Sequence, residues 1–322
     1  MRVLVTGGSG LVGSAVRYIT EHETGRFGGN NQGAEEWVFV SSAECDLRDF
    51  EATKSLFARV RPTHVLHLAA RVGGLFANMQ QPADFMRDNL AINDSVLQNA
   101  HDFGVEKVVS CLSTCIFPDA VDYPLTEAKV HLGPPHASNF GYAYAKRMVD
   151  VQNKAYHQQY GDMFTSVIPT NVFGPGDNYN LTSAHVIPAL MHKCYLSLSP
   201  GAPPFVVAGT GRPLRQFVYS RDLARLMVWA VREYVDVEPI ILSPSEHDEV
   251  SIATVATAIA RTMGINAPLT FDTAKPDGQF RKPASNAKLV SLLPEFKFTP
   301  FDEALKESTE WFVQHYDKGA RV

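Results

Sequence analysis

Tyr142 and Lys146 stand four residues apart in the stretch YAYAK, a spacing that places two side chains on one face of a helix. A phenol has a pKa near ~10, which is too high for ready proton exchange at neutral pH. A nearby ammonium stabilises the phenolate and lowers that pKa. The pair therefore predicts a tyrosine that exchanges a proton with a carbonyl or hydroxyl group. The lysine could also form a hydrogen bond to the ribose of a nicotinamide cofactor. The alternative is an ordinary amphipathic helix.

Ser113 and Cys115 follow the apolar stretch EKVVSC, where the chain must leave a strand. A thiolate is a competent base once its pKa falls from ~8.5. A small buried hydrophobe is the alternative use of this cysteine. The other cysteines, Cys45, Cys111 and Cys194, are too few and too scattered for a disulfide framework, and the pair at 111 and 115 lacks zinc-site spacing. We expect no metal site.

The N-terminus predicts a dinucleotide site. Residues 2–5 read as a buried strand, then TGGSGLVG leads into a helical pattern at 11–22. Glycines at this spacing make a tight turn, let the backbone approach a pyrophosphate and let helix and strand pack closely. A glycine turn without a ligand is the alternative. The residues expected to contact the cofactor here are Gly7, Gly8, Ser9, Gly10, Leu11, Val12 and Gly13.

The second strand, expected at 37–42, bears on the choice of cofactor. An acidic residue at this point binds the ribose 2′-hydroxyl of NAD. Here the strand ends in two serines, and the next acidic residue is Glu44. The absence of an acid at the strand end favours NADP over NAD. No arginine stands there, however, to pair with the 2′-phosphate of NADP. Asp46 and Leu47 are expected to approach the adenine. An acid in a helix N-cap region is the alternative for Asp46.

Strands and helices alternate along the first half of the chain. Further strands are expected at 63–70, 106–113 and 164–170, and helices at 49–62, 82–104 and 141–161. This alternation predicts an α/β fold with a Rossmann-type, doubly wound parallel sheet. After Asn171 the chain becomes rich in Gly, Pro, Asn and Ser, returns to the sheet around 216–234 and 239–243, and ends in a helix at 301–316. We expect an NADP-binding domain of 1–172 plus 217–243 and a smaller substrate-binding domain of 173–216 plus 244–322.

Composition narrows the class of protein. The net charge is −5, from 29 Lys and Arg against 34 Asp and Glu, and no long basic run is present, so we expect no nucleic-acid partner. No run of 18 apolar residues predicts a membrane span. The first strand begins at once, without a signal peptide, so the expected location is cytoplasmic.

Together, TGGSGLVG, LST and YAYAK resemble the extended short-chain dehydrogenase/reductases, which modify nucleotide sugars. More narrowly, the chain resembles the GDP-L-fucose synthase family along essentially its whole length, in segments such as HLAARVGGL, VVSCLSTCIFP, SNFGYAYAKRMVDVQNKAY and VIPTNVFGP. The related sugar 4,6-dehydratases carry an acidic pair where this chain has Cys115 and Ile116, which speaks against dehydration.

The resemblance implies a bifunctional enzyme. It inverts C3 and C5 of GDP-4-keto-6-deoxy-D-mannose and reduces the C4 ketone with NADPH, forming GDP-L-fucose. Cys115 and His185 match the base and the acid that the family uses for inversion. Ser113 matches the serine that forms a hydrogen bond to the keto oxygen. Tyr142 would protonate that oxygen, and Lys146 would tune Tyr142. A plain helix-start residue is the alternative for His185.

The resemblance also implies binding residues. Those on the cofactor side include Tyr142, Lys146, His185, Leu68, Ala69, Ala70, Pro169, Thr170, Asn171 and Val172. Those on the substrate side are Ser113, Asn171, Lys193, Arg215 and Asp277. Surface charges are the alternative for Lys193 and Arg215, and a turn residue for Asp277. The chain departs from the family where Ala208 replaces a common tryptophan and Gly176 replaces a histidine.

Family members are homodimers that pair two helices of each subunit, which match residues 82–103 and 141–159 here. Two other functions stay open: a sugar 4-epimerase that retains NAD, and a non-catalytic NADP-binding sensor. The intact Ser113, Tyr142 and Lys146 set speaks against a sensor, since a sensor has no need of all three.

Overall fold

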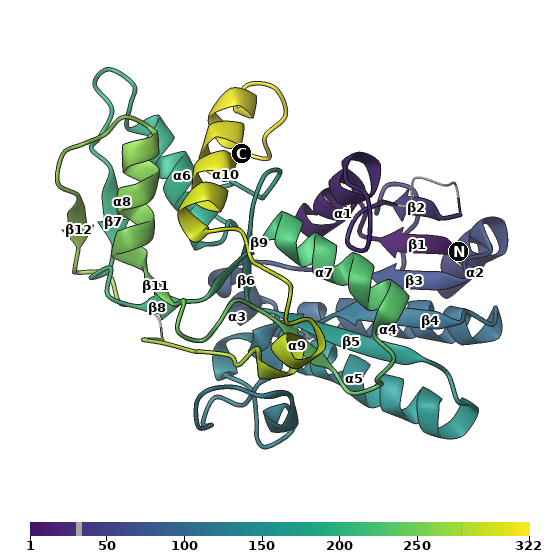
Figure 1. Cartoon of the computed structure of the whole chain (residues 1–322). Helices are drawn as coiled ribbons and strands as arrows, with labels where there is room; N and C mark the ends of the chain where they lie inside the picture. Colours follow the sequence, from purple (N-terminus) through teal and green to yellow (C-terminus); the bar gives the residue numbers. More distant parts are fainter. Residues whose placement is uncertain (30–33, 278) are drawn as a thin grey trace. The chain divides into compact units, whose positions relative to one another are not determined.

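The computed structural model describes residues 1–29, 34–277 and 279–322 (Figure 1). The described chain divides into two compact units. The first consists of Met1–Asp122, Thr126–Pro169 and Arg221–Leu242, and the second of Tyr123–Leu125, Thr170–Ser220 and Ser243–Val322. The sequence placed the boundaries between an NADP-binding and a substrate-binding domain at 172, 216 and 243. These functional boundaries remain predictions, since the division above describes only compactness.

The first unit is built on a parallel sheet. Within the described residues its six strands lie in the order β10-β5-β4-β3-β1-β2. The strands are β1 Arg2–Thr6, β2 Glu36–Val40, β3 His64–His67, β4 Lys107–Cys111, β5 Phe164–Pro169 and β10 Ile240–Leu242. Apolar side chains of the inner strands, such as Leu4, Leu66 and Val109, are fully buried. This confirms the expected Rossmann-type α/β fold.

Helices cover both faces of this sheet. They are α1 Leu11–His22, α2 Phe50–Val60, α3 Leu75–Gln80, α4 Pro82–Asp102, α5 Phe140–Tyr160 and α7 Ser220–Glu233. Figure 1 shows α4 and α5 side by side on one face, with α1 and α7 on the other. Short 3-10 helices occupy Thr114–Ile116, Glu127–Lys129 and Ala137–Asn139. Helix α5 packs against β5 and against the 3-10 helix Thr114–Ile116 that follows β4, so it lies beside the predicted site.

Strands β2 and β3 end earlier than the sequence predicted, because side chains take over the next backbone groups. After Val40 the amide and hydroxyl of Ser41 donate to the Glu44 carboxylate at 2.9 and 2.8 Å. After His67 the amides of Leu68 and Ala69 both donate to the Thr6 hydroxyl at 3.2 Å. These bonds turn the chain out of the sheet at the edge where the predicted cofactor residues lie.

Two arginines of α7 hold the chain that follows α1. Arg225 Nη2 lies 2.6 Å from the Glu23 carboxylate. Arg232 Nη2 lies 2.6 Å from Glu35, and Arg232 also donates to the carbonyls of Arg26 and Gly28 at 2.8 Å. Arg232 is therefore a part-buried arginine that fastens a loop through main-chain oxygens.

The second unit has its own core. Its elements are β6 Asn171–Phe173, α6 Val186–Leu196, β7 Val206–Ala208, β8 Leu214–Arg215, β9 Phe217–Tyr219, β11 Val250–Ser251, α8 Ile252–Thr262, β12 Thr270–Asp272, α9 Ala287–Leu292 and α10 Phe301–His315. Aromatic rings fill the core, with Tyr179 stacked on Phe312 at 4.3 Å between centroids. The sequence predicted that the strand near residue 217 returns to the large sheet. In the structure this strand, β9, pairs instead in parallel with β6, and Phe217 lies opposite Asn171.

Within the described ranges, no helix is long and apolar enough to cross a membrane. In the same ranges no three His, Cys, Asp or Glu side chains gather as ligands for a metal ion.

Candidate functional site

The glycine loop after β1 fits a dinucleotide. Gly7 has a φ of +67°, and a Cβ there would lie 2.9 Å from the Ala69 amide nitrogen. A Cβ on Gly13 would overlap the carbonyl oxygen of Gly7. The loop therefore packs directly on residues 68–70 and brings two predicted cofactor segments together. The first turn of α1 holds no acidic residue, so its free amides are open to a pyrophosphate.

The expected adenine-side residues lie beyond β2. Leu47 is buried. The Asp46 carboxylate is paired with Arg48 at 2.7 Å, and this arginine holds the pKa of Asp46 below its usual range. Arg48 also reaches Asp88 of α4 at 3.4 Å. Asp46 is thus part of an ion-pair group in this unit.

Lys146 and Tyr142 share one face of α5. Lys146 is only 3% exposed, and its Nζ donates to the Cys111 carbonyl at 2.8 Å. Burial, together with the nearby thiols of Cys115 and Cys111, raises the pKa of Tyr142 well above 10. The sequence predicted a lowered pKa instead. The difference arises because Tyr142 is buried, and burial disfavours the charged phenolate. At neutral pH Tyr142 keeps its proton, the form that a general acid needs.

Ser113 and Cys115 sit on the turn after β4. Ser113 caps the 3-10 helix Thr114–Ile116, and its Oγ accepts from the Cys115 amide at 3.3 Å. Ile116 is fully buried and anchors the turn in the core. Cys115 is half-buried, and its thiol lies close enough to Tyr142 and Lys146 to affect the pKa of each. The structure therefore gathers four of the five predicted catalytic residues within the first unit.

Arg147 is a residue of this site that the sequence reasoning missed. Its side chain is 7% exposed. Its Nε donates to the Ile116 carbonyl at 2.8 Å, its Nη2 donates to the same oxygen, and its Nη1 donates to Gly133 O at 2.8 Å. No spacing signal marks it, because an arginine next to a lysine on an amphipathic helix usually faces solvent.

His185 and Lys193 belong to the second unit. His185 is the N-cap residue of α6, and Lys193 lies in the last turn of that helix. Both side chains are exposed. Protein atoms around the imidazole nevertheless lower the pKa of His185 by desolvation. A histidine at a helix N-terminus is also disfavoured as a cation by the helix dipole.

The remaining substrate-side residues are tied to loops of the second unit. Asp277 accepts from the amide and hydroxyl of Thr210 at 2.8 and 2.6 Å, so its carboxylate closes the turn around 209–211. Arg215 is half-buried, and its Nη1 donates to Leu214 O at 2.7 Å. Burial lowers the pKa of Arg215. Thr210 was not expected, because only the fold shows that it meets Asp277.

The segment of residues 169–172 leaves the large sheet. Pro169 ends β5, and Thr170 Oγ1 lies 3.1 Å from Ser243 Oγ. Asn171 and Val172 belong to β6, where Asn171 Nδ2 donates to Gln216 O at 2.9 Å. The Asn171 amide is therefore held in a defined orientation before any ligand binds.

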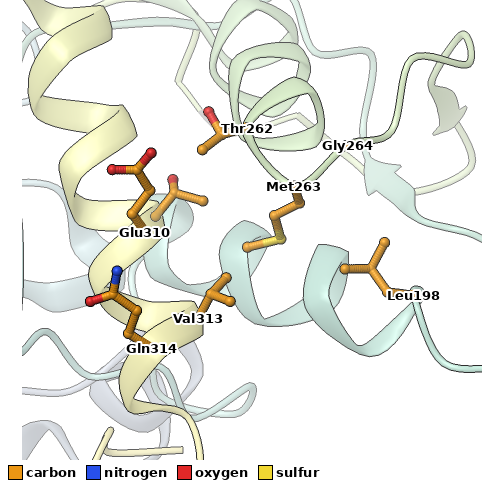
Figure 2. A pocket seen from close by; sticks show the side chains of 8 residues that line it. Leu198, Thr262, Met263, Gly264, Glu310, Val313 and Gln314 are labelled. Atoms are coloured by element: carbon orange, nitrogen blue, oxygen red, sulfur yellow. The ribbon is translucent and has the colours of Figure 1, made fainter.

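Figure 2 shows an open groove of about 450 Å³ in the second unit, with Met263, Val313 and Leu198 on its walls and Glu310 at its edge. Among the described residues that line it, none is an expected site residue.

The sequence of this chain is similar to those of known enzymes. A model of the NAD dependent epimerase/dehydratase family matches residues 3–242. A GDP-L-fucose synthase of Dictyostelium discoideum is 53% identical over 316 residues, which is 98% of this chain and 96% of the relative. A probable GDP-L-fucose synthase of Drosophila melanogaster is 52% identical and covers 99% of each chain.

A solved structure agrees with these relatives. The crystal structure of a GDP-L-fucose synthetase from Naegleria fowleri bound to NADP has a TM-score of 0.91 at 47% identity, and the match covers 100% of this chain and 96% of that one. The resemblance read from the motifs is confirmed. The chain belongs to the NAD dependent epimerase/dehydratase family, within the branch of the GDP-L-fucose synthases.

Proposed function

We propose that this chain converts GDP-4-keto-6-deoxy-D-mannose to GDP-L-fucose by 3,5-epimerisation and NADPH-dependent 4-reduction. Relatives that carry the synthase name at 53% and 52% identity support this activity. The structural observation that carries it is the bond from Lys146 Nζ to the Cys111 carbonyl at 2.8 Å, which joins the helix of Tyr142 and Lys146 to the strand end that leads into Ser113 and Cys115. A base for inversion and an acid for reduction can then serve the same sugar.

NADP(H) fits the first unit. The relative from Naegleria fowleri was crystallised with NADP. Here the loop of residues 7–13 and the adjoining residues 68–70 would hold the cofactor. The glycines let the loop pack tightly on residues 68–70, and the backbone amides at the start of α1 would bind a pyrophosphate. When bound, NADPH supplies a hydride to C4 of the sugar. Tyr142, Lys146, His185 and residues 169–172 stay predicted contacts.

The inversion needs a base on one face of the sugar and an acid on the other. The C4 ketone makes the protons on C3 and C5 acidic. The Cys115 thiolate removes such a proton, and the electron pair of the C–H bond moves toward the keto oxygen, where the Ser113 hydroxyl donates a hydrogen bond. His185 then gives a proton to the same carbon from the opposite face, which inverts that centre.

The reduction uses Tyr142. Its phenol donates a proton to the C4 oxygen as the hydride reaches C4, and the resulting phenolate is stabilised by the Lys146 ammonium. Because its pKa is raised, Tyr142 stays protonated until this step.

Binding and assembly complete the proposal. Lys193 and Arg215 hold the diphosphate of the substrate through charge-assisted hydrogen bonds, and Asp277 acts by shaping the loop that contains Thr210. Two chains form a homodimer through α4 and α5, where Met86, Phe140, Met148 and Val151 are exposed apolar side chains. The cytoplasmic location expected from the sequence stays a prediction.

The test compares Cys115→Ser with Tyr142→Phe, using the GDP-keto-sugar, NADPH and deuterated water. We expect Cys115→Ser to lose deuterium incorporation at C3 and C5 by roughly 10²–10⁴-fold while some direct reduction persists. Tyr142→Phe should keep the incorporation and lose NADPH oxidation.

Three outcomes would contradict parts of the proposal. Full incorporation in Cys115→Ser removes that residue as the base. Bound NAD without net NADPH oxidation, together with inversion at C4, identifies a sugar 4-epimerase. Cofactor binding with no change in any sugar identifies a sensor.

A further inference from the structure

Two neighbouring cations of α5 hold the two ends of the segment that carries Ser113 and Cys115. Lys146 Nζ donates to the carbonyl of Cys111, before the two residues. Arg147 donates two hydrogen bonds to the carbonyl of Ile116, directly after Cys115. The 111–116 segment is therefore fixed from both sides by one turn of one helix.

The guanidinium of Arg147 is buried without a carboxylate partner among the residues that the structure describes. Its hydrogen bonds go to main-chain oxygens of Ile116 and Gly133, and it stacks over the Tyr144 ring with 5.3 Å between Cζ and the centroid. Burying a positive charge costs free energy unless a nearby group compensates for it. Burial accordingly lowers the pKa of Arg147, and the Cys115 thiol acts in the opposite direction.

This arrangement matters for a cysteine base. A thiol becomes a thiolate more readily beside a fixed cation in a partly buried site. Tyr142 is neutral, so it offers no such charge. Lys146 and Arg147 are the cations that the described structure places close enough to Cys115 to interact electrostatically. Lys146 already has a task beside Tyr142, whereas the proposed reaction gives no other task to Arg147.

We propose that Arg147 is a positioning residue that fixes the turn bearing Cys115 and favours the thiolate of that cysteine. The inference rests on the proposed role of Cys115 as the base of inversion. A purely structural arginine would need only to satisfy two carbonyls, and a neutral donor could do the same. The proposal differs because it requires the charge as well as the bonds.

The experiment measures the thiol itself. The NADP⁺-loaded protein is alkylated with iodoacetamide between pH 5 and 10, and the rate at Cys115 is read by peptide mass spectrometry. Arg147→Met removes bonds and charge, whereas Arg147→Lys keeps the charge and one donor. Arg232→Met is the matched control, because Arg232 is also part-buried and also holds a loop by its carbonyls.

We expect Arg147→Met to raise the pKa of Cys115 by about one unit, so that alkylation at pH 7 slows ~10-fold. Arg147→Lys should restore much of the rate, and Arg232→Met should leave it unchanged. With the keto-sugar, the share of inverted product should fall ~10-fold in Arg147→Met while direct reduction continues, because only the inversion depends on the thiolate.

An unchanged alkylation profile in folded Arg147→Met would overturn the inference, as would an equal slowing in Arg232→Met. If Arg147→Met does not fold, Arg147→Gln replaces it, since it keeps a donor and removes the charge. A wild-type rate in that variant also overturns the inference. The proposed function fails separately: if Cys115→Ser still inverts the sugar, Cys115 is not the base, whatever the alkylation shows.

Discussion

At the scale of the residue, Asp177 shows how burial alters one carboxyl group. It is 4% exposed, its Oδ1 accepts from the Asn178 amide at 2.7 Å, and its Oδ2 has no hydrogen-bond partner among the described residues. Burial raises its pKa to about 7. The folded state therefore holds a proton that the unfolded chain, with a pKa near ~4, has released.

This shift predicts the sign of a pH effect. The stability that the proton provides is complete below about pH 4 and is lost as the pH rises through about 7. Asp177→Asn keeps the shape and removes the charge, so we expect the variant to be more stable than the wild type at pH 8 by up to about 4 kcal/mol. The advantage should shrink as the pH falls to 4. Urea unfolding across this range measures it, and parallel curves for the two proteins would show that Asp177 does not titrate as expected.

Single residues also show where sequence reasoning succeeds. Tyr142, Lys146 and Cys115 were predictable because their types carry chemistry and their spacing follows a helix or a strand end. Arg147 and Thr210 were not, because their roles depend on main-chain oxygens and on a carboxylate that lie far along the chain. Periodicity does not report such contacts.

At the scale of the element, a buried hydrogen-bonded chain connects β1, β3, α4 and α5. The Thr6 hydroxyl lies 2.8 Å from His67 Nδ1, His67 Nε2 lies 3.1 Å from Asn93 Oδ1, and Asn93 Nδ2 donates to Ala145 O at 3.3 Å. The Thr6 hydroxyl already accepts two amides, so it donates its own proton to Nδ1. The single N–H of the neutral ring is therefore on Nε2, which donates to Asn93 Oδ1. Burial lowers the pKa of His67 to about 3, so the ring is neutral.

We expect His67→Phe to lower the free energy of unfolding by about 2–3 kcal/mol, because Thr6 and Asn93 lose a buried partner. Adding Asn93→Leu should cost less than the sum of the two single changes, since both act on one chain of bonds. A double-mutant cycle by urea unfolding tests this coupling. Strict additivity would mean that the two side chains do not act together.

The elements themselves were largely predictable. The helix expected at 11–22 was found at those bounds, because a glycine loop and an apolar stripe mark it. Strand ends were less accurate. β3 stops at His67 because the Thr6 side chain binds the next two amides, and no local pattern in 63–70 reveals that interaction.

At the scale of the whole molecule, the proposed dimer gives a direct test. Met148 and Val151 of α5 are 38% and 40% exposed, and Val235 outside α4 and α5 is 75% exposed. We expect the wild type to have twice the 35.5 kDa mass of one chain. Met148→Glu with Val151→Glu should give single chains, because a buried interface excludes unpaired charge. Val235→Glu is the control and should leave the mass unchanged.

Light scattering after gel filtration measures these masses. A wild type of single-chain mass, or a dimer that survives both glutamates, would contradict the proposed interface. The sequence predicted this surface only through resemblance, because an apolar stripe that faces a sheet and one that faces a second subunit read alike.

The bonds from α5 to the Cys111 and Ile116 carbonyls have a consequence for how this fold diversifies. A main-chain oxygen is the same in every residue, so the two cations hold the turn without regard to the side chain at position 115. Evolution could therefore exchange the reactive group there and keep its placement. The 4,6-dehydratases, with an acidic pair at this point, illustrate such an exchange. The position of the reactive group therefore depends on the two cations of α5, and its chemistry depends on the residue at position 115.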